Sequence, residues 1–361
     1  MKITDVRAVS FYLGELERPH QNAIISFTSK EVTFAEVETD DGVTGRSFAA
    51  RSERDVIEGP LRDRLVGMDP MGAARCWHQM FTGWRKPVAK GEVVASIGSV
   101  DNALWDLRGK VLNSPVYMLL GGFRDRVPAY AAGGYYEVGK GLAELAEEML
   151  HFVDAGYRAV KMKVGGAPFA EDVARVRAAR EAVGDDISLM IDANNAWGAY
   201  EAITFGRAVE KYRISWFEEP CWPDDLAGAA EVCRALDMPI ASGEIEFTRW
   251  GARDLIERRA ADIVQVDPHT TGGLTEWMRI AALASAHHVP IAPHGNHYVG
   301  AHAVAAADNG LIVESYARLD SWQDEFFAPM QLEDGDLVVP QVPGLGIEAD
   351  LTGLAKASRP R

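Results

Sequence analysis

The sequence contains few cysteines and no long apolar run. Its 361 residues include three cysteines, Cys76, Cys221 and Cys233, and none of them forms a CxxC pair. This number and spacing argue against a disulfide framework or a zinc site and are typical of reduced thiols in a cytoplasmic protein. No apolar run reaches the roughly 18 residues needed to span a membrane, and the first residues, MKITDVRAVSFYL, do not read as a signal peptide. We therefore expect a cytoplasmic protein that has no membrane as a partner.

The sequence also contains fewer basic than acidic residues. Lys and Arg number 37 against 53 Asp and Glu, which gives a formal net charge of −16. Such a field repels nucleic acids and anionic surfaces, so neither is an expected partner. The remaining composition, 47% hydrophobic and 25% charged, excludes a disordered or fibrous chain. The length suggests two domains, or one large barrel with an additional module.

Residues 1–125 combine strand and helix patterns. Residues 2–12 and 32–39 alternate between apolar and polar side chains, as strands do, and the sequence DDGVTG at 40–45 is typical of a turn into a third strand. Helical patterns follow, including an apolar stripe over residues 93–111. We interpret this part of the chain as an N-terminal α+β capping domain.

From residue 126 the pattern changes to short apolar strands that alternate with helical stretches, which indicates parallel βα units. Eight strands are predicted, and we assign the barrel that they form to residues 126–317. Residues 318–361 are irregular, with turns such as EDGDL and VPGLG, and are expected to return to the first module. The predicted strands lie at residues 129–134, 159–165, 187–194, 214–220, 239–244, 262–268, 289–295 and 311–316.

Seven titratable residues stand at or just beyond the carboxyl ends of seven successive predicted strands. The intervals between them are 20 to 29 residues, close to one βα unit each. Because the carboxyl ends of the strands of a parallel barrel converge on one mouth, these side chains are expected to face one another there. Charged residues scattered at random over solvated loops would not all fall at strand ends with this regular spacing, so we interpret the set as a functional site. The seven are Lys163, Asp192, Glu218, Glu244, Asp267, His294 and Glu314.

Three successive members of this set are carboxylates. Asp192, Glu218 and Glu244 offer hard oxygen ligands without sulfur or imidazole, which favours Mg²⁺ over zinc. In the sequence EEP at 218–220, strand alternation lets one glutamate point inward, and the spacing favours Glu218. Glu219 is then expected to be a structural partner of the site.

Two further pairs carry candidate bases. Lys161 and Lys163 lie on the same face of one strand, where adjacent ammonium groups are expected to lower each other's pKa and leave one lysine able to act as a base. The alternative is that both lysines reach solvent. Asp267 and His294 end neighbouring strands, so the carboxylate is expected to fix the imidazole tautomer. His294 is preferred because it closes its strand, unlike the other histidines considered, which are His287, His288, His297 and His302.

Together these residues resemble the strand-end motifs of the enolase superfamily, mandelate racemase/muconate lactonizing enzyme type. The resemblance covers nearly the whole chain and implies a modified (β/α)₇β TIM barrel beneath an N-terminal α+β capping domain, with a C-terminal segment that returns to the cap. It also implies symmetric homo-oligomers. The motifs, in family order, are ALWDLRGKVLNSPVYMLLGG (103–122), KMKVG (161–165), DANNAW (192–197), WFEEP (216–220), SGE (242–244), VDPHTTGG (266–273) and APHG (292–295).

The resemblance also implies roles for individual residues. The three carboxylates would bind Mg²⁺, and the lysine pair and the histidine–aspartate pair would provide bases on two faces of the substrate. Lys163 would be the lysine base, assisted by Lys161. Glu314 matches the family's acid that hydrogen-bonds the enolate oxygen. Because an ionised carboxylate would repel that intermediate, Glu314 is expected to be protonated; the alternative is an ion pair with a neighbour such as Arg318.

The implied reaction begins with removal of the proton α to a carboxylate, giving an enediolate that Mg²⁺ stabilises. Loss of water from a sugar acid, giving a 2-keto-3-deoxy acid, is favoured as the next step, because residues 17–30 carry many hydrogen-bonding side chains suited to a polyhydroxy substrate. His20, Arg51 and Asn194 are the predicted substrate-binding residues. Two alternatives stay open: racemisation or epimerisation of a 2-hydroxy acid, and binding of a sugar acid without catalysis.

Overall fold

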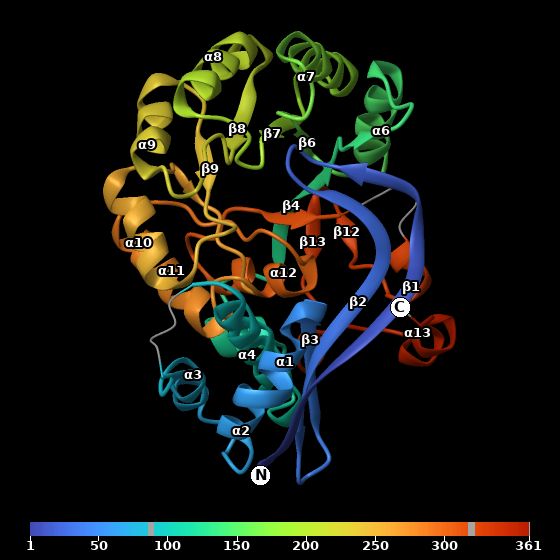
Figure 1. Ribbon diagram of the computed structural model, residues 1–361, viewed down its shortest axis with the longest axis vertical. Coiled ribbons are helices and arrows are strands. Elements are labelled where there is room, and N and C mark those ends of the chain that lie inside the picture. Colours follow the sequence, from blue (N-terminus) through green and yellow to red (C-terminus); the bar gives the residue numbers. More distant parts are fainter. Residues whose placement is uncertain (86–89, 317–321, 361) are drawn as a thin grey trace.

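The computed structural model describes residues 1–85, 90–316 and 322–360 (Figure 1). These residues form a barrel surrounded by helices and a smaller cap that packs against the loops at the mouth of the barrel. The predicted fold class, a modified TIM barrel with an N-terminal α+β capping domain, is confirmed. Within the described residues, no helix combines the length and the apolar character needed to cross a membrane.

The cap is built on an antiparallel sheet with the strand order β3-β2-β1-β5. The predicted strands at 2–12 and 32–39 are present, but their pairing continues across bulges to Gln21 and Ser26. Residues 17–30 are therefore the end of a long hairpin, which arches from the cap toward the barrel in Figure 1. The strands are β1 (Ile3–Gln21), β2 (Ser26–Thr39), β3 (Thr44–Ala49) and β5 (Tyr136–Glu137).

Helices follow the sheet, and the longest of them is α4 (Glu92–Val111). Its predicted apolar stripe packs against the sheet, with Ile97 and Leu104 fully buried. Gly45 on β3 allows this close packing, because a Cβ there would lie 2.1 Å from the carbonyl oxygen of Ala103. The other cap helices are η1 (Arg51–Glu53), α1 (Arg54–Val56), η2 (Ile57–Leu61), α2 (Arg62–Leu65), α3 (Ala73–Phe81) and α5 (Val116–Leu120).

The barrel strands run parallel in the order β10-β9-β8-β7-β6-β4, and β11 pairs with β4. They are β4 (Arg126–Gly133), β6 (Ala159–Lys163), β7 (Ser188–Asp192), β8 (Ile214–Glu218), β9 (Ile240–Ser242), β10 (Ile263–Val264) and β11 (Val313–Ser315). The helices around them are α6 (Leu142–Asp154), α7 (Phe169–Val183), α8 (Ala199–Val209), η3 (Glu210–Tyr212), α9 (Leu226–Ala235), α10 (Thr248–Arg258), α11 (Leu274–Ala286) and α12 (His297–Ala306).

The strand predicted at residues 289–295 is not a regular strand. Only Ile291 forms bridges, one to Val264 and one to Gly310. Prolines on both sides of Ile291 explain this difference, because Pro290 and Pro293 have no N–H to donate to a ladder. The neighbouring backbone still closes the barrel: the N–H of Ala292 donates to Val264 at 3.0 Å and the N–H of Leu311 donates to Ile291 at 2.8 Å.

Large side chains fill the interior of the barrel below its mouth. Tyr130 and Trp216 are almost completely buried there and their rings meet edge to face. They form a cluster with Ala132, Met190, Ala241 and Ala292. Because this cluster fills the barrel, the charged side chains at the strand ends lie on a closed floor.

The C-terminal segment returns to both parts of the molecule. β13 (Asp336–Val338) pairs with β12 (Leu332–Glu333) and with the first half of β4. Leu354 on α13 (Leu351–Ala357) is buried in a cluster with cap residues, and the N–H of Arg359 donates to Tyr12 on β1 at 2.7 Å. The predicted domain boundary at residues 317 and 318 lies outside the described residues.

Candidate active site

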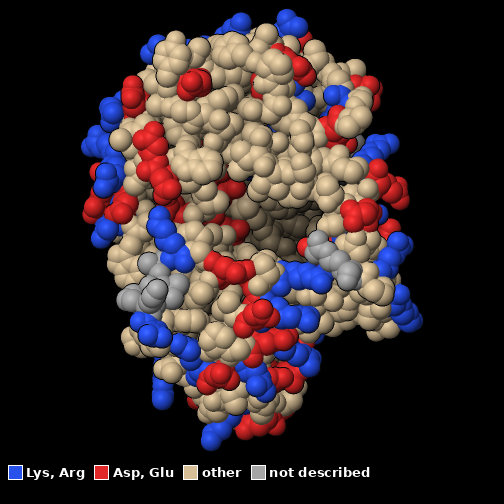
Figure 2. Space-filling view, in the orientation of Figure 1, with Lys and Arg blue, Asp and Glu red and all other residues tan. Residues whose placement is uncertain are grey.

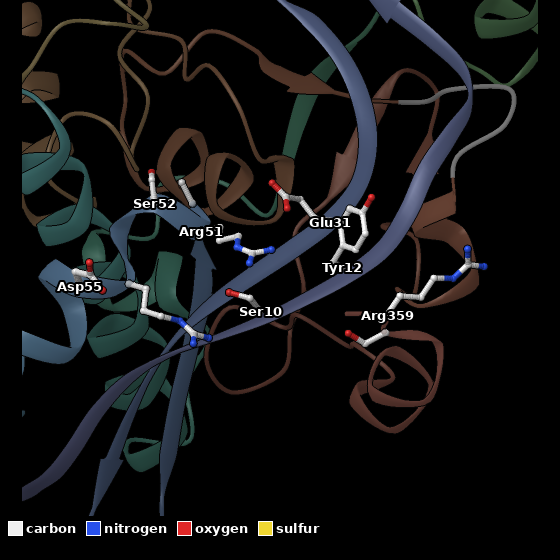
Figure 3. A pocket seen from close by; sticks show the side chains of 10 residues that line it. Ser10, Tyr12, Glu31, Arg51, Ser52, Asp55 and Arg359 are labelled. Atoms are coloured by element: carbon white, nitrogen blue, oxygen red, sulfur yellow. The ribbon is translucent and has the colours of Figure 1, made fainter. Parts of the chain in front are cut away.

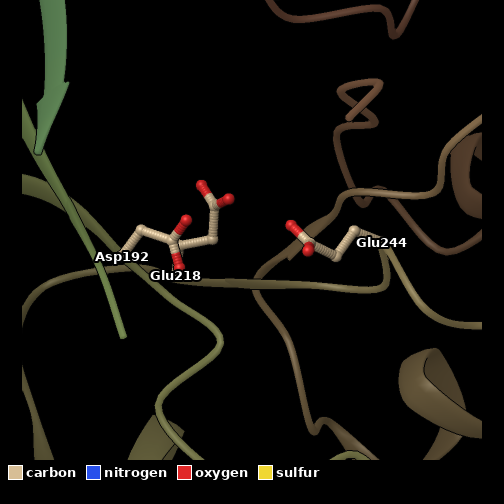
Figure 4. A group of neighbouring side chains, drawn as sticks. All are labelled: Asp192, Glu218 and Glu244. Atoms are coloured by element: carbon tan, nitrogen blue, oxygen red, sulfur yellow. The ribbon is translucent and has the colours of Figure 1, made fainter. Parts of the chain in front are cut away.

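Three carboxylates meet at the mouth of the barrel, as Figure 4 shows. Asp192 and Glu218 are the last residues of β7 and β8, and Glu244 lies two residues beyond β9. One oxygen atom from each residue lies within 4.8 Å of the other two. Glu244 Oε2 is buried and has no hydrogen-bond partner among the described residues. A compact set of oxygen ligands with unused acceptor capacity fits Mg²⁺.

The backbone around these carboxylates is strained in a way that orients them. Asn194, Asn195 and Glu219 all have positive φ, and for Glu219 this conformation is unusual. The N–H of Asn194 donates to Asp192 Oδ1 at 2.8 Å. Glu219 Oε2 accepts a hydrogen bond from Asn195 Nδ2 at 2.7 Å, and burial raises the pKa of Glu219 well above its usual value, with further increases from neighbouring carboxylates. This is the position expected of a structural partner.

Lys161 and Lys163 are buried beside the carboxylates, with exposed fractions of 1% and 4%. Lys161 Nζ lies 2.5 Å from Glu218 Oε1 and 2.8 Å from Glu314 Oε1, and Lys163 pairs with Asp192. The alternative in which both lysines reach solvent is therefore wrong.

Lys161 does lower the pKa of Lys163, as expected, but the net result is not a lysine with a lowered pKa. Burial acts to lower the pKa of both groups, but the charges of Glu218 and Glu314 on Lys161, and of Asp192 on Lys163, outweigh it. Both pKa values are raised because the paired carboxylates favour the charged ammonium form more strongly than burial and the neighbouring ammonium group disfavour it.

His294 and Asp267 form the predicted pair, with Nδ1 of His294 3.0 Å from Asp267 Oδ2. On its other side, Nε2 of His294 lies 3.5 Å from Glu244 Oε2. Burial acts to lower the pKa of His294, but the nearby charges of Glu244 and Glu314 raise it well above its usual value. Among the other histidines, His302 is buried in α12, where its Nδ1 accepts the N–H of Tyr117 at 3.1 Å.

Glu314 is brought into the site, but not in the predicted protonation state. Burial acts to raise its pKa, but the charges of Lys161 and His294 outweigh it and lower the pKa to about 2. Its Oε2 also accepts the N–H of Gly295 at 2.9 Å and the hydroxyl of Tyr316 at 3.2 Å. Glu314 is therefore an ionised acceptor, and the alternative partner Arg318 lies outside the described residues.

A cavity of about 780 Å³ lies between these groups and the hairpin of the cap. It is visible as the central hollow in Figure 2. Lys163, Asn194, Glu244 and His294 contribute to its lining, and His20 closes it from the cap. The cap-side and C-terminal lining also includes Arg18, Asn22, Ile25, Phe27, Ser29, Lys30, Trp322, Gln323 and Asp324.

Two of the three predicted substrate-binding residues therefore lie at this cavity. Asn194 is buried there with its Oδ1 lacking a hydrogen-bond partner in the described part of the chain, and His20 stacks on Phe27 with ring centroids 5.1 Å apart. Arg51 does not lie at this cavity. It lines a separate cavity of about 740 Å³ near α1 and Arg359, shown in Figure 3.

Tyrosines at the site were not predicted from the sequence. Tyr316 OH lies 3.5 Å from His294 Nε2, and Tyr130 OH accepts from Lys161 Nζ at 3.3 Å and from Gln265 Nε2 at 3.2 Å. Tyr316 follows Glu314 by two residues, so strand alternation would have placed it on the same face. Tyr130 resembles any core aromatic residue, and nothing in its sequence context distinguishes it.

The fold and the site together define a class of proteins: capped parallel barrels that carry a carboxylate metal site and basic groups at the mouth. Two family models match the chain. Residues 6–121 match the mandelate racemase/muconate lactonizing enzyme N-terminal domain, and residues 142–352 match the enolase C-terminal domain-like family. The chain belongs to the mandelate racemase/muconate lactonizing enzyme group of the enolase superfamily.

Relatives in this group include a dehydratase and a cycloisomerase. Arabinonate dehydratase from Saccharolobus solfataricus is 37% identical over 88% of this chain and 87% of its own length. D-galactarolactone cycloisomerase from Agrobacterium fabrum is 32% identical over 100% of both chains. Among solved structures, a racemase from Streptomyces coelicolor with bound magnesium superposes with a TM-score of 0.91, at 30% identity over 99% of this chain and 100% of that chain.

Proposed function

We propose that the protein is a Mg²⁺-dependent sugar-acid dehydratase that forms a 2-keto-3-deoxy acid. The observation that carries this proposal is the placement of a lysine and a histidine at one cavity, beside three carboxylates that are grouped as metal ligands would be. Lys163 and His294 line that cavity together with Glu244. Removal of a proton from one carbon and protonation of a leaving hydroxyl on the next carbon require two such groups.

The metal would be held by Asp192, Glu218 and Glu244, whose oxygen atoms are already close together. When bound, Mg²⁺ would offset the charge of its ligands and of the substrate carboxylate, which lowers the pKa of Lys163 and the barrier to α-proton removal.

In the proposed reaction, Lys163 acts as the neutral amine: it takes the α-proton, and the electrons of the broken C–H bond form the enediolate. His294, charged and hydrogen-bonded to Asp267, then donates its proton to the β-hydroxyl as the C–O bond breaks and water leaves. The enol that remains gains a proton at the β-carbon on becoming the 2-keto-3-deoxy acid. Ionised Glu314 holds the Lys161 ammonium group in the floor of the site.

The lining of the cavity supports a polyhydroxy substrate. Arg18, His20, Asn22, Ser29 and Lys30 reach it from the hairpin and provide hydrogen-bonding groups. Such groups pair with hydroxyls, whereas an aromatic acid would be favoured by an apolar lid. The names of the curated relatives, which act on arabinonate and D-galactarolactone, support the same substrate class.

Racemisation or epimerisation of a 2-hydroxy acid is the second candidate. The observation that favours it is again the presence of basic groups from two sides of the site, since proton removal by one and return by the other inverts the α-carbon. Binding of a sugar acid without turnover is the third candidate, although binding alone requires neither Lys163 nor His294.

The test is a screen of aldonic and aldaric acids with the Mg²⁺-loaded protein. Product would be detected as a 2-keto-3-deoxy acid, and substrate would be recovered from D₂O and examined by NMR. We expect keto-acid formation from at least one sugar acid. Stereoinversion without keto acid would establish the second candidate, and binding without α-proton exchange would establish the third; either result would overturn the proposal.

A further inference from the structure

An ion pair between cap and barrel, buried at its cap end and partly exposed at its barrel end, lies directly behind the His294–Asp267 pair. Glu53, in the short helix η1 of the cap, is 1% exposed. Its Oε1 lies 2.5 Å from Nε2 of His269, which belongs to the loop after β10, and its Oε2 accepts the hydroxyl of Ser99 on α4 at 2.7 Å. Burial acts to lower the pKa of His269, but the hydrogen bond and charge of Glu53 outweigh it and raise the pKa.

The same loop holds the carboxylate of the catalytic pair. The backbone N–H of His269 donates to Asp267 Oδ1 at 2.6 Å, while Oδ2 of that carboxylate meets Nδ1 of His294. The two oxygen atoms of Asp267 therefore connect a backbone amide on one side to the imidazole on the other. A rotation of the peptide at His269 would turn the Asp267 carboxylate away from His294.

Side-chain packing does not hold Asp267 from the cap side. A cavity of about 140 Å³ lies there, lined by Asp267 and His269 and by cap residues that include Ser47, Ala50 and Asn102. Because the cap leaves space behind the carboxylate, its orientation depends on hydrogen bonds and on the position of the loop.

We propose that Glu53 is a positioning residue for the His294–Asp267 pair, and that the cap orients the catalytic imidazole through His269. This inference rests on the proposed function and deepens it, because it assigns a part of the cap to one of the two catalytic groups. Glu53 touches neither the metal ligands nor the cavity residues that face the substrate. Its removal should therefore weaken the steps that require His294 and leave those that require Lys163.

The first test compares Glu53→Ala and Glu53→Gln in the Mg²⁺-loaded enzyme with a sugar-acid substrate. We expect Glu53→Ala to lower kcat about 10- to 100-fold with little change in KM, as is usual when the partner that orients a catalytic ligand or base is lost. Glu53→Gln keeps an acceptor oxygen for His269 and should recover most of this loss. The matched control is Thr275→Val. It removes the side-chain hydrogen bonds of Thr275 with Asp101 and Trp105, which also cross the interface between cap and barrel, and it leaves the contacts of the Asp267 carboxylate unchanged.

A double-mutant cycle separates positioning from general destabilisation. In a His294→Asn background the Glu53→Ala substitution should cost little more, whereas in a Lys163→Ala background it should cost as much as in the unmodified enzyme. In D₂O, Glu53→Ala should show the α-proton exchange pattern of His294→Asn. Equal losses in both backgrounds, or equal losses for Glu53→Ala and Thr275→Val, would overturn the proposal.

A readout that does not depend on turnover keeps this inference separate from the proposed function. Imidazole ¹⁵N spectra of the Mg²⁺-loaded protein without substrate report the tautomer and hydrogen bonding of His294. We expect Glu53→Ala to shift the His294 signals and Thr275→Val to leave them in place. If no sugar acid is converted, the proposed reaction fails while these spectra still test Glu53; unchanged His294 signals in Glu53→Ala would refute its positioning role.

Discussion

Buried charges at the mouth of the barrel are compensated by their neighbours, residue by residue. Lys161 lies between Glu218 and Glu314, Lys163 pairs with Asp192, and His294 lies between acidic groups. A buried charge is costly unless it is paired and hydrogen-bonded. Replacing one member therefore changes the charge state of the others as well as removing its own contacts.

The two adjacent glutamates at the end of β8 should respond differently to amide substitution. Glu218→Gln replaces a carboxylate of the proposed metal site with a neutral amide and should lower turnover at least about 10²-fold. Glu219→Gln should cost far less, because Glu219 is not among the three grouped carboxylates, and a glutamine there keeps an acceptor oxygen for the Asn195 Nδ2 group that Glu219 Oε2 now accepts from. Turnover and Mg²⁺ affinity by titration calorimetry would measure both effects. The reverse order would mean that Glu219 is the ligand.

Glu314 should influence the pH profile through its charge. Its carboxylate raises the pKa of His294, so Glu314→Gln should lower that pKa while keeping an acceptor for the Gly295 N–H. If charged His294 is the acid, the alkaline limb of kcat should move to lower pH by at least about one unit, the effect expected of one nearby charge. Glu314→Asp, which keeps the charge, serves as the control. An unshifted limb in Glu314→Gln would show that Glu314 does not act on His294.

At the scale of strands and helices, the elements that the sequence pattern predicts best are those with a regular period. The seven strand-end residues keep the spacing of βα units, and the structure brings all seven to one mouth. The regular ladder expected at 289–295 is interrupted because its prolines cannot donate to neighbouring strands. The continuation of the hairpin over residues 17–30 was not predicted, because its many polar side chains break the alternating pattern that indicates a strand, although His20 pairs with Phe27 and Gln21 with Ser26.

The charge state of Glu314 marks another limit of sequence reasoning. Its low pKa depends on Lys161 from β6 and on His294 from the loop before α12, two elements that sequence spacing places at the mouth but does not bring to a known distance. Similarly, the ion pair between Glu53 and His269 joins residues that are 216 positions apart in the sequence. Neither residue stands in a motif that would have indicated the other.

The turn at the end of the β1–β2 hairpin should affect substrate binding. Asn22 Oδ1 accepts the N–H groups of Ile24 and Ile25 at 2.9 and 2.7 Å, which fixes the end of the hairpin beside the cavity. Asn22→Ala should raise KM several-fold, which corresponds to a loss of about 1 kcal/mol in the free energy of substrate binding. It should change kcat less. Asp40→Ala, which removes a hydrogen bond to the N–H of Lys2 at the far turn, is the control. Equal KM values for the two variants would contradict a role for the hairpin turn.

Helix α12 should make stability depend on pH through His302. This fully buried imidazole accepts the N–H of Tyr117 and meets the carbonyl oxygen of Leu345, and burial lowers its pKa from 6.5 to about 4. The unfolded chain takes up this proton below pH 6.5 and the folded chain does so only near pH 4. The pKa shift of His302 therefore contributes about 3 kcal/mol to the free energy of unfolding above pH 6.5, and this contribution is lost as the pH falls from 6.5 to 4.

Denaturant unfolding at several pH values would measure this loss. His302→Gln cannot titrate, so its stability should fall less steeply between pH 6.5 and 4 than that of the unmodified protein, although it starts lower. His297, whose pKa burial also lowers to about 4, titrates in both proteins and provides a common background. Parallel curves for the two proteins would exclude His302 as the source.

At the scale of the whole molecule, removal of the metal should abolish catalysis and leave the fold intact. The large apolar clusters lie between the strands and their helices and inside the cap, away from the three carboxylates. Without an ion, Lys161 and Lys163 already pair with Glu218 and Asp192. Chelation should therefore abolish turnover while circular dichroism changes little, and Mg²⁺ or Mn²⁺ should restore activity. Full activity after chelation, or unfolding on chelation, would contradict this expectation.

The return of the C-terminal segment to β1 has a consequence for synthesis on the ribosome. Phe11 and Phe34 of the hairpin share a buried cluster with Leu354, and Tyr12 accepts the N–H of Arg359. The hairpin is among the first parts of the chain to be made, yet its supporting contacts are made more than three hundred residues later. Part of the apolar surface of the nascent hairpin therefore stays exposed to water until residues 351–359 emerge.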